Sequence, residues 1–348
     1  MKTRILTIDP SHPDPAVIAE AAYVLRSGGL VAFPTETVYG LGANALDPDA
    51  VQRIFIAKDR PATDPLIVHI AERADLASVA LDLPPIADEL VQRCFPGALT
   101  LILKRHPRIA ANVSAGLDTV AVRMPSHLVA HALIAAAGIP VAAPSANRFS
   151  RPSATTVRHV LQDLDGRVDM ILDGGAAFIG VESTILDLTV DPPAVLRPGG
   201  VSLESIRQIV PSAVVRSRFV NLDSAASAPG QMLKHYSPRA ELRLYIGSPQ
   251  DMIAQIAEDA RALTAAGKRV GVLVANEDAL DLPNAAILRL GSASDLNQIA
   301  VNLFSGMRDL DARHVDVILA RDFGENGLGL AIRDRLTRAA EGRIIQVG

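Results

Sequence analysis

Polar side chains that could bind a charged ligand are gathered in five short islands between apolar segments. Each island follows a run of residues typical of a buried strand, so each stands where a strand is expected to end. The islands are PTETVYGLGANA (34–45), KDRPATDP (58–65), APSANRFSRPSATT (143–156), GVESTILD (180–187) and RPGG (197–200). Because loops at strand ends of α/β proteins converge on one crevice, the sequence predicts a single site.

The side chains available to this site favour an anionic ligand that carries phosphate. The cations are Lys58, Arg60, Arg123 and Arg197. The neutral donors are Thr35, Ser145, Asn147, Ser153, Ser183 and Thr184. The glycines that would permit close backbone approach are Gly40, Gly42 and Gly180. Carboxylates are few, and no Ser-His-Asp spacing or acidic dyad is visible. The pattern therefore favours catalysis by positioning and charge stabilisation, as in transfer at phosphorus.

Each island taken alone also has an ordinary structural interpretation. PTETVYGLG is compatible with a turn in which Thr35 and Thr37 cap the local backbone. Lys58 and Arg60 are compatible with a solvated helix end, where cations are favourably placed near the C-terminus. His69 lies inside LIVHI and is compatible with a hydrogen-bonded core histidine.

The elements around the islands alternate between helix-like and strand-like patterns from residue 15 to about 210. Asp47 is a predicted N-cap with Pro48 at the first helical position, so a helix is expected over 47–57. Further helices are expected at 16–27, 127–137 and 155–164. Strands are expected at LVAFPT, LIVHI, ALTLILK, TVAVRMP, IPVAAPSA, MILDGG, STILDLT and AVLRPGG. This irregular alternation predicts an α/β domain around a twisted mixed sheet.

The pattern of alternation is lost at 211–238, which gathers Ser, Ala and Pro and reads as a linker. Residues 239–348 then alternate strands and helices regularly, which predicts a smaller Rossmann-like, doubly wound parallel domain. The predicted organisation is a catalytic domain at 1–210, a linker at 211–238 and a small C-terminal α/β domain at 239–348.

Composition limits the classes of function. The chain has 348 residues, of which 49% are hydrophobic, so two globular domains are expected. No signal-peptide core or apolar run of membrane-spanning length is visible, which predicts a cytoplasmic protein without membrane association. The single cysteine, Cys94, excludes an internal disulfide and any thiolate zinc cluster, and its apolar neighbours indicate a buried structural thiol.

The charge balance argues against a protein that binds nucleic acid mainly through phosphate neutralisation. The formal net charge is −4, and neither 1–210 nor 239–348 has an excess of basic residues. Aromatic residues are 3% of the chain, which leaves few platforms for base stacking. An RNA-binding or ribosome-maturation module is therefore the alternative function, and stable nucleic-acid binding is not expected.

The motifs in their order resemble one known family. The series PTETVYGLG, K-x-RP with PLIVHI, PGALTLIL, VAVRMP, APSAN with S-x-TT, GVESTILDL and LRPG resembles the YrdC-type domain of the L-threonylcarbamoyladenylate synthases over residues 15–200. PGQMLKHYSP at 229–238, followed by a small α/β domain, resembles the long two-domain, Sua-type branch of that family.

That resemblance implies a nucleotidyltransferase. Its members join L-threonine, bicarbonate or CO2, and ATP into threonylcarbamoyl-AMP and release pyrophosphate. A second enzyme, a tRNA threonylcarbamoyl transferase, then modifies adenosine beside the anticodon of certain tRNAs. The resemblance further implies that Mg2+ bridges the ATP phosphates and that the protein itself provides no metal site.

The resemblance assigns roles to individual residues. Lys58 and Arg60 match the family's K-x-R pair, and Ser145 and Asn147 its S-x-N pair, around the ATP phosphates as the catalytic set. The further implied nucleotide contacts are Thr119, Ser153, Arg197 and, from a linker segment that would close as a lid, Tyr236. The implied threonine pocket consists of Thr35, His69, Arg123, Ala143 and Ser183, with Arg123 as partner of the substrate carboxylate.

The sequence departs from the family pattern at two positions. Asp64 stands where the family usually has Asn before the PL of the K-x-RP loop, which puts a nucleotide contact in question. Ala154 replaces the usual Pro between two hydroxyl residues. A carbamoyl-transfer domain like that of hydrogenase maturation proteins is a nearer rival, but those proteins carry zinc-finger and acylphosphatase parts, and this chain has one cysteine.

Overall fold

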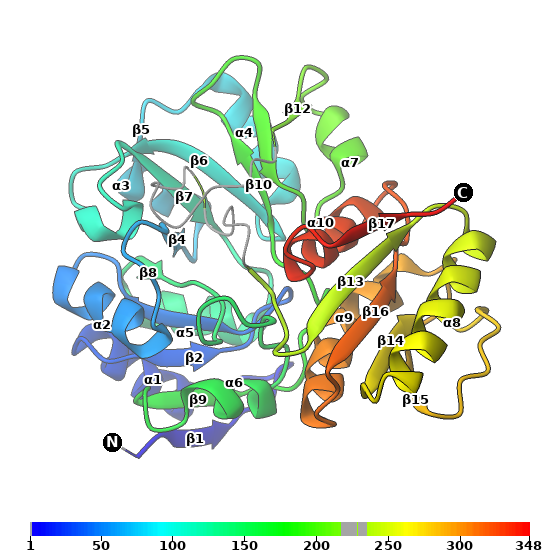
Figure 1. Cartoon of the computed structure of the whole chain (residues 1–348). Helices are drawn as coiled ribbons and strands as arrows, with labels where there is room; N and C mark the ends of the chain where they lie inside the picture. Colours follow the sequence, from blue (N-terminus) through cyan, green and yellow to red (C-terminus); the bar gives the residue numbers. More distant parts are fainter. Residues whose placement is uncertain (1, 217–227, 229–234) are drawn as a thin grey trace. The chain divides into compact units, whose positions relative to one another are not determined.

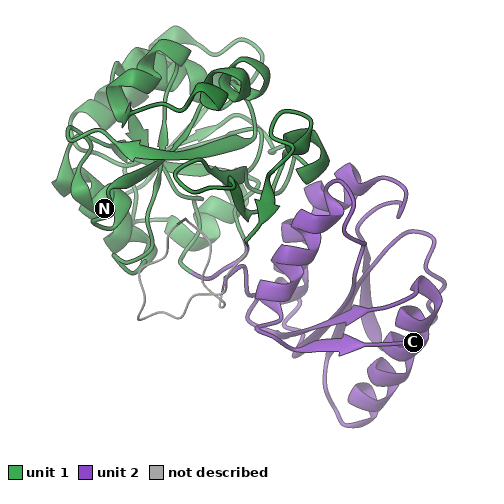
Figure 2. Cartoon of the chain, turned by 90° about the horizontal axis from the view of Figure 1, so that it is seen from above, with its two compact units in different colours: residues 1–149, 153–232 green, residues 150–152, 233–348 purple. Residues whose placement is uncertain are grey.

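The computed structural model describes residues 2–216, 228 and 235–348, and the chain divides into two compact units (Figure 2). The first unit comprises Met1–Phe149 and Ser153–Met232, and the second comprises Ser150–Pro152 and Leu233–Gly348. Much of the linker predicted at 211–238 falls on residues 217–227 and 229–234, which lie outside the described residues.

The first unit is built on one mixed sheet (Figure 1). Its strands are β1 (Arg4–Thr7), β2 (Val31–Phe33), β3 (Gly40–Asn44), β4 (Ile67–His69), β5 (Ala80–Leu81), β6 (Leu99–Arg105), β7 (Thr119–Arg123), β8 (Val141–Ala142), β9 (Met170–Asp173), β10 (Thr184–Asp187), β11 (Ala194–Arg197) and β12 (Val214–Val215). Their order is β1-β9-β2-β3-β8-β4-β7-β6-β10-β11-β12, with β5 paired to β6. Strand β4 runs parallel to β7 and antiparallel to β8, so the predicted mixed sheet is confirmed.

Helices cover both faces of this sheet. They are α1 (Pro15–Arg26), α2 (Pro48–Lys58), α3 (Leu76–Val79), α4 (Pro85–Cys94), α5 (Leu128–Ala137), α6 (Val157–Leu164) and α7 (Leu203–Arg207), with 3-10 turns η1 (Arg73–Asp75) and η2 (Ala111–Ser114). Val31 and Phe33 of β2 pack in one apolar cluster with α1 and α5, whereas Ala32 joins the other cluster with α2 and α6. Side chains of a strand alternate between faces, so this short strand joins two cores.

Helix α2 delivers Lys58 to the end of the second island. The side chain of Asp47 accepts hydrogen bonds from the backbone N–H groups of Asp49 and Ala50, and Pro48 occupies the first turn, as the sequence predicts. Asp59 has a left-handed backbone with φ of 53°, which stops the helix immediately after Lys58.

The sequence interpretation was wrong for GLGAN, which was assigned to a polar loop and forms strand β3. A Cβ added to Gly42 would lie 2.8 Å from Phe33 Cε1 and 2.9 Å from Val141 Cγ1. Gly42 therefore allows close packing between neighbouring strands rather than backbone approach to a ligand.

Cys94 also differs from the expected buried thiol, because it is only half-buried at the end of α4.

The second unit is a parallel α/β domain. Its strands are β13 (Glu241–Ile246), β14 (Val270–Val274), β15 (Ala285–Arg289), β16 (Val317–Arg321) and β17 (Ile344–Gln346), in the order β15-β14-β16-β13-β17. Its helices are α8 (Pro249–Ala265), α9 (Leu296–Ala312) and α10 (Gly329–Ala339). All four strand pairs are parallel, so the predicted fold class of this domain is confirmed.

Among the described residues, no helix combines the length and apolar character needed to cross a bilayer.

Candidate functional site

The first and third islands are joined by backbone hydrogen bonds. Leu41 N–H donates to the carbonyl of Pro144 at 2.8 Å, and Ala146 N–H donates to the carbonyl of Tyr39 at 2.7 Å. Between these bonds, Gly40 and Ser145 form an isolated antiparallel bridge. The start of β3 therefore fixes the loop that carries Ser145 and Asn147.

The fourth and fifth islands join the same region. Gly180 N–H donates to the carbonyl of Thr37 at 3.1 Å, which ties the fourth island to the first. Gly200 N–H donates to the carbonyl of Glu182 at 3.0 Å, and a Cβ on Gly199 would lie 2.3 Å from that same oxygen. The RPGG turn therefore needs glycine for close contact with the fourth island, and the convergence predicted for the islands is present in the structure.

Lys58 links the K-x-R and S-x-N pairs directly. Its side chain is 1% exposed, and Nζ donates to the carbonyl of Ser145 at 2.5 Å and to the carbonyl of Asn147. Phe149 N–H returns a hydrogen bond of 2.8 Å to the carbonyl of Lys58. The alternative of a solvated helix end is therefore wrong for Lys58, because its ammonium group lies inside the loop of the third island.

Arg60 is also buried, and it contacts two residues of its own loop. Its Nη2 lies 2.9 Å from Oδ2 of Asp64, and the guanidinium donates to the carbonyls of Asp64 at 3.1 Å and Pro65 at 2.8 Å. Asp64 is the residue that departs from the family pattern, and it gives Arg60 a buried anion that an asparagine could not supply.

His69 and Arg123 lie opposite each other in the parallel pair β4 and β7. Both side chains are buried, and Nη2 of Arg123 lies 2.8 Å from Oε1 of Glu36, while Nε donates to the carbonyl of Gly97 at 3.2 Å. Nδ1 of His69 lies 3.1 Å from the carbonyl oxygen of Ile67. Burial and the charge of Arg123 lower the pKa of His69 to about 3, so its imidazole is neutral at neutral pH.

Glu36 stays ionised in spite of its burial. Desolvation raises the pKa of its carboxyl group, but the charge of Arg123 and nearby donors outweigh that effect, and the pKa is lowered overall. The site therefore contains a buried ion pair, Glu36 with Arg123, beside a neutral imidazole.

The remaining residues implied for the threonine pocket lie on the same group of elements. Thr35 caps its own turn, since its hydroxyl donates to the carbonyl of Val38 at 2.6 Å. Ala143 N–H donates to the carbonyl of Ile67 at 2.8 Å, next to His69. Arg197 donates to the carbonyl of Ser183 at 2.8 Å, which places these two predicted residues together.

Two predicted residues, Thr119 and Tyr236, are not joined to this cluster by the contacts above. Thr119 begins β7, whereas Arg123 ends it, so the two lie at opposite ends of the strand. Ser153, in contrast, is buried and donates to the carboxylate of Glu182, which joins it to the fourth island. Tyr236 belongs to the second unit, where its ring lies 5.4 Å from the ring of Phe304.

Sequence reasoning missed the buried carboxylates of the site. Glu36 is 1% exposed, and Glu182, the partner of Ser153, is 6% exposed. Both were visible in the sequence as acids next to hydroxyl residues, Glu36 between Thr35 and Thr37 and Glu182 before Ser183, and that contrast was the available signal. Within the described ranges, no group of three or more His, Cys, Asp or Glu residues could hold a metal ion.

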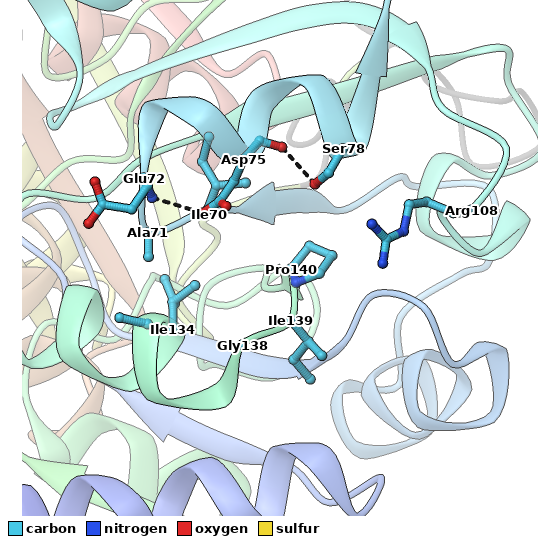
Figure 3. A pocket seen from close by; sticks show the side chains of 11 residues that line it. Ile70, Ala71, Glu72, Asp75, Ser78, Arg108, Ile134, Gly138, Ile139 and Pro140 are labelled. Atoms are coloured by element: carbon cyan, nitrogen blue, oxygen red, sulfur yellow. Dashed lines mark hydrogen bonds between the residues drawn. The ribbon is translucent and has the colours of Figure 1, made fainter.

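A separate pocket of about 340 Å³ opens elsewhere on the first unit, and Figure 3 shows its lining. Its polar wall includes Asp75, which accepts a hydrogen bond from Glu72 N–H at 2.9 Å and, through its carbonyl, from the hydroxyl of Ser78 at 2.7 Å. Arg108 lines another side of it. No residue predicted for the functional site lines this pocket.

Two family models together match most of the chain. The model described as telomere recombination, which represents Sua5, YciO and YrdC proteins, matches residues 23–199. The model described as the C-terminal domain of threonylcarbamoyl-AMP synthase matches residues 201–341.

Full-length relatives and a solved structure are also similar to the chain. A threonylcarbamoyl-AMP synthase of Bacillus subtilis is 44% identical, with 99% of this chain and 100% of the relative covered. A threonylcarbamoyl-AMP synthase of Pyrococcus abyssi is 45% identical, with 94% and 95% covered. The crystal structure of P. abyssi Sua5 complexed with L-threonine superposes with a TM-score of 0.94 at 43% identity, covering 99% of this chain and 100% of that one.

Proposed function

The chain belongs to the two-domain threonylcarbamoyl-AMP synthase family, and from that premise we propose that it makes threonylcarbamoyl-AMP and pyrophosphate from L-threonine, bicarbonate or CO2, and ATP. The family predicted from the sequence motifs is thereby confirmed. The product would pass in the cytoplasm to a tRNA threonylcarbamoyl transferase, which the resemblance implies as the downstream partner.

The observation that carries the proposal is the junction at Lys58. One ammonium group contacts the carbonyls of both members of the S-x-N pair, so the two motifs assigned to the ATP phosphates form one structural unit. Arg60 lies two residues after Lys58, in the loop that follows α2. A lysine point charge and a planar arginine fork two residues apart suit a polyphosphate, because they can contact different oxygens as charge moves to the leaving group.

The proposed reaction has two steps. The neutral amine of threonine attacks carbon of CO2 to give N-carboxy-threonine with loss of a proton, or attacks bicarbonate with loss of water. An oxygen of the new carboxylate then forms a bond to the α-phosphorus of ATP, and the bond from that phosphorus to the bridging oxygen of the pyrophosphate breaks. Lys58, Arg60, Ser145 and Asn147 would position the triphosphate and stabilise the charge on the departing pyrophosphate.

The second substrate would lie against the His69 and Arg123 pair. Arg123 is the proposed partner of the threonine carboxylate, because a guanidinium binds a carboxylate through two parallel hydrogen bonds and so fixes its orientation. His69 contributes a neutral, polar edge rather than a second cation, since its pKa is about 3. Thr35, Ala143 and Ser183 are the proposed remaining walls, and Thr119, Ser153, Arg197 and Tyr236 the proposed further nucleotide contacts.

Mg2+ held by the triphosphate would neutralise phosphate charge that the protein cations do not cover. The donor set fits an ion bound mainly by substrate and water, because hydroxyls outnumber carboxylates in the islands, and Asp64 already pairs with Arg60.

Release of pyrophosphate from ATP tests this function. With bicarbonate present, we expect release to depend on L-threonine and to be lost in Lys58→Ala and Arg123→Ala. The threonine analogue without the hydroxyl, 2-aminobutyrate, is the matched control substrate. Release that is independent of any amino acid, or equal in the two variants and the unchanged protein, would contradict the proposal.

A further inference from the structure

The ion pair between Glu36 and Arg123 is buried but incompletely satisfied. The two side chains are 1% and 4% exposed, and Oε1 of Glu36 lies 2.8 Å from Nη2 of Arg123. However, neither carboxylate oxygen of Glu36, nor Nη2 of Arg123, makes a well-aligned hydrogen bond to any residue that the structure describes, although the backbone N–H groups of Glu36 and Ser126 lie close enough to help lower the pKa of the Glu36 carboxyl group. Buried polar groups in proteins almost always have such partners, so this pair has capacity for a ligand.

The pair has the charge pattern of a receptor for an α-amino acid. In a zwitterion, the ammonium and carboxylate groups are attached to the same carbon, so a complementary site needs a cation and an anion in contact. Glu36 and Arg123 meet that requirement at 2.8 Å, and a carboxylate alone would need only the arginine. Burying two charges with few well-aligned hydrogen bonds is costly, and a bound zwitterion would supply additional ones.

We propose that Glu36 binds the α-ammonium group of the amino-acid substrate while Arg123 binds its carboxylate. The inference rests on the proposed function, because it concerns the threonine that this reaction consumes. It describes the binding step, before the amine loses its proton. Glu36 is thereby a specificity-determining residue that selects α-amino acids over acids lacking the amine.

The groups around Glu36 support a role as the anion for a cationic substrate group. Arg123 is its ion-pair partner, and His69, opposite Arg123 in the sheet, is neutral. His127 also faces this region, and burial lowers the pKa of its imidazole. Of these neighbours, only Arg123 is a cation. The Glu36 carboxylate can therefore accept a further hydrogen bond from an ammonium group.

The inference is tested by measuring the affinities of two probes for the full chain by calorimetry, without ATP. The two probes are L-threonine and 2,3-dihydroxybutyrate of the same configuration, in which a hydroxyl replaces the amine. The unchanged protein is expected to bind threonine more tightly. In Glu36→Gln, threonine affinity should fall about tenfold or more, the loss of one charge-assisted hydrogen bond. The affinity of the hydroxy acid should be unchanged or higher, because Arg123 loses its competing anion.

Three other results would overturn the inference. If Glu36 only occupies Arg123 until substrate arrives, both probes will bind Glu36→Gln more tightly. If Glu36 serves only the fold, both affinities will fall together with the melting temperature. If the unchanged protein does not prefer threonine over the hydroxy acid, no residue binds the amine, and this result needs no variant.

A matched control distinguishes a specific effect of Glu36 from the general effect of neutralising a buried carboxylate. Asp311 is 8% exposed in α9 of the second unit and accepts hydrogen bonds from the backbone N–H groups of Arg239 and Ala240. Asp311→Asn should leave both affinities unchanged. If the unchanged protein binds threonine poorly in every condition, the proposed function fails; if it binds threonine but Glu36→Gln retains the preference for the amine, only the present inference fails.

Discussion

Arg60 has its counterion within its own loop. The carboxylate of Asp64 lies 2.9 Å from the guanidinium, and both side chains are almost fully buried. This pairing weakens the positive potential that a triphosphate would meet at Arg60. The departure from the family's asparagine therefore has an electrostatic consequence that can be measured.

Replacing Asp64 by Asn should strengthen ATP binding. Removing one negative charge beside Arg60 is expected to lower the KM for ATP by roughly fivefold, which corresponds to about 1 kcal/mol of charge interaction. Initial rates of pyrophosphate release over a range of ATP concentrations give this constant. A folded variant with an unchanged or higher KM would show that Arg60 does not contact the nucleotide.

His69 should remain neutral well below neutral pH. Since its pKa in the folded protein is about 3 and its ordinary value is 6.5, the unfolded chain takes up a proton that the folded chain does not accept between these values. Its contribution to stability is therefore present above pH 6.5 and is lost as the pH falls toward 3, at up to about 1.4 kcal/mol per pH unit.

Nuclear magnetic resonance of protein with labelled histidine checks this directly. The ring signals of His69 should not shift between pH 8 and pH 5. In Arg123→Gln the pKa of His69 should rise, because the neighbouring positive charge that opposes protonation is gone. A midpoint near 6.5 in the unchanged protein would mean that the imidazole is solvated rather than buried.

At the scale of elements, strand β3 holds the first and third islands together. Its glycines let β2 and β8 approach from either side, since a Cβ on Gly42 would lie less than 3 Å from atoms of Phe33 and Val141. A Cβ on Gly40, two residues earlier on the same strand, would lie 3.3 Å from Phe33 at its closest.

Gly42→Ala should therefore destabilise the first unit by about 1–3 kcal/mol through overpacking. Thermal unfolding followed by circular dichroism gives the change in melting temperature. Gly40→Ala is the matched control on the same strand and should lower the melting temperature less. Equal effects of the two substitutions would mean that strand entropy, rather than packing, determines the cost.

Local signals allowed most elements to be predicted from the sequence. Asp47 and Pro48 marked the start of α2, and the apolar runs marked β4, β6 and β7. Strand β3 was not predicted, because GLGAN lacks the β-branched and aromatic residues that indicate strands, and its glycines reflect contacts with distant segments. The same limit applies to Glu36, whose partner Arg123 is remote in sequence and becomes its neighbour only through folding.

At the scale of the whole molecule, the second unit includes a tripeptide from the third island. Ser237 N–H donates to the carbonyl of Ser150 at 2.7 Å, and the guanidinium of Arg308 in α9 donates to the carbonyl of Pro152. This tripeptide stands between Asn147 and Ser153, two residues proposed to contact the nucleotide. The second unit can thereby influence the site through the covalent chain.

Arg308→Ala should lower the turnover of pyrophosphate release or raise the KM for ATP at least fivefold, because the Pro152 carbonyl loses its donor. Arg308→Lys, which retains one donor, should recover part of the activity. Arg313→Ala, an exposed position just after the same helix, is the control. A variant with lower melting temperature but unchanged kinetic constants would limit Arg308 to a structural role.

Because Ser150–Pro152 belong to the second unit, no single cut in the chain separates the two units. A gene fragment ending before residue 229 would keep the tripeptide but lose Ser237 and Arg308, and a fragment beginning there would lack the carbonyls that these donors bind. Recombination at the linker would therefore also break the contacts that Ser237 and Arg308 make with this tripeptide of the third island.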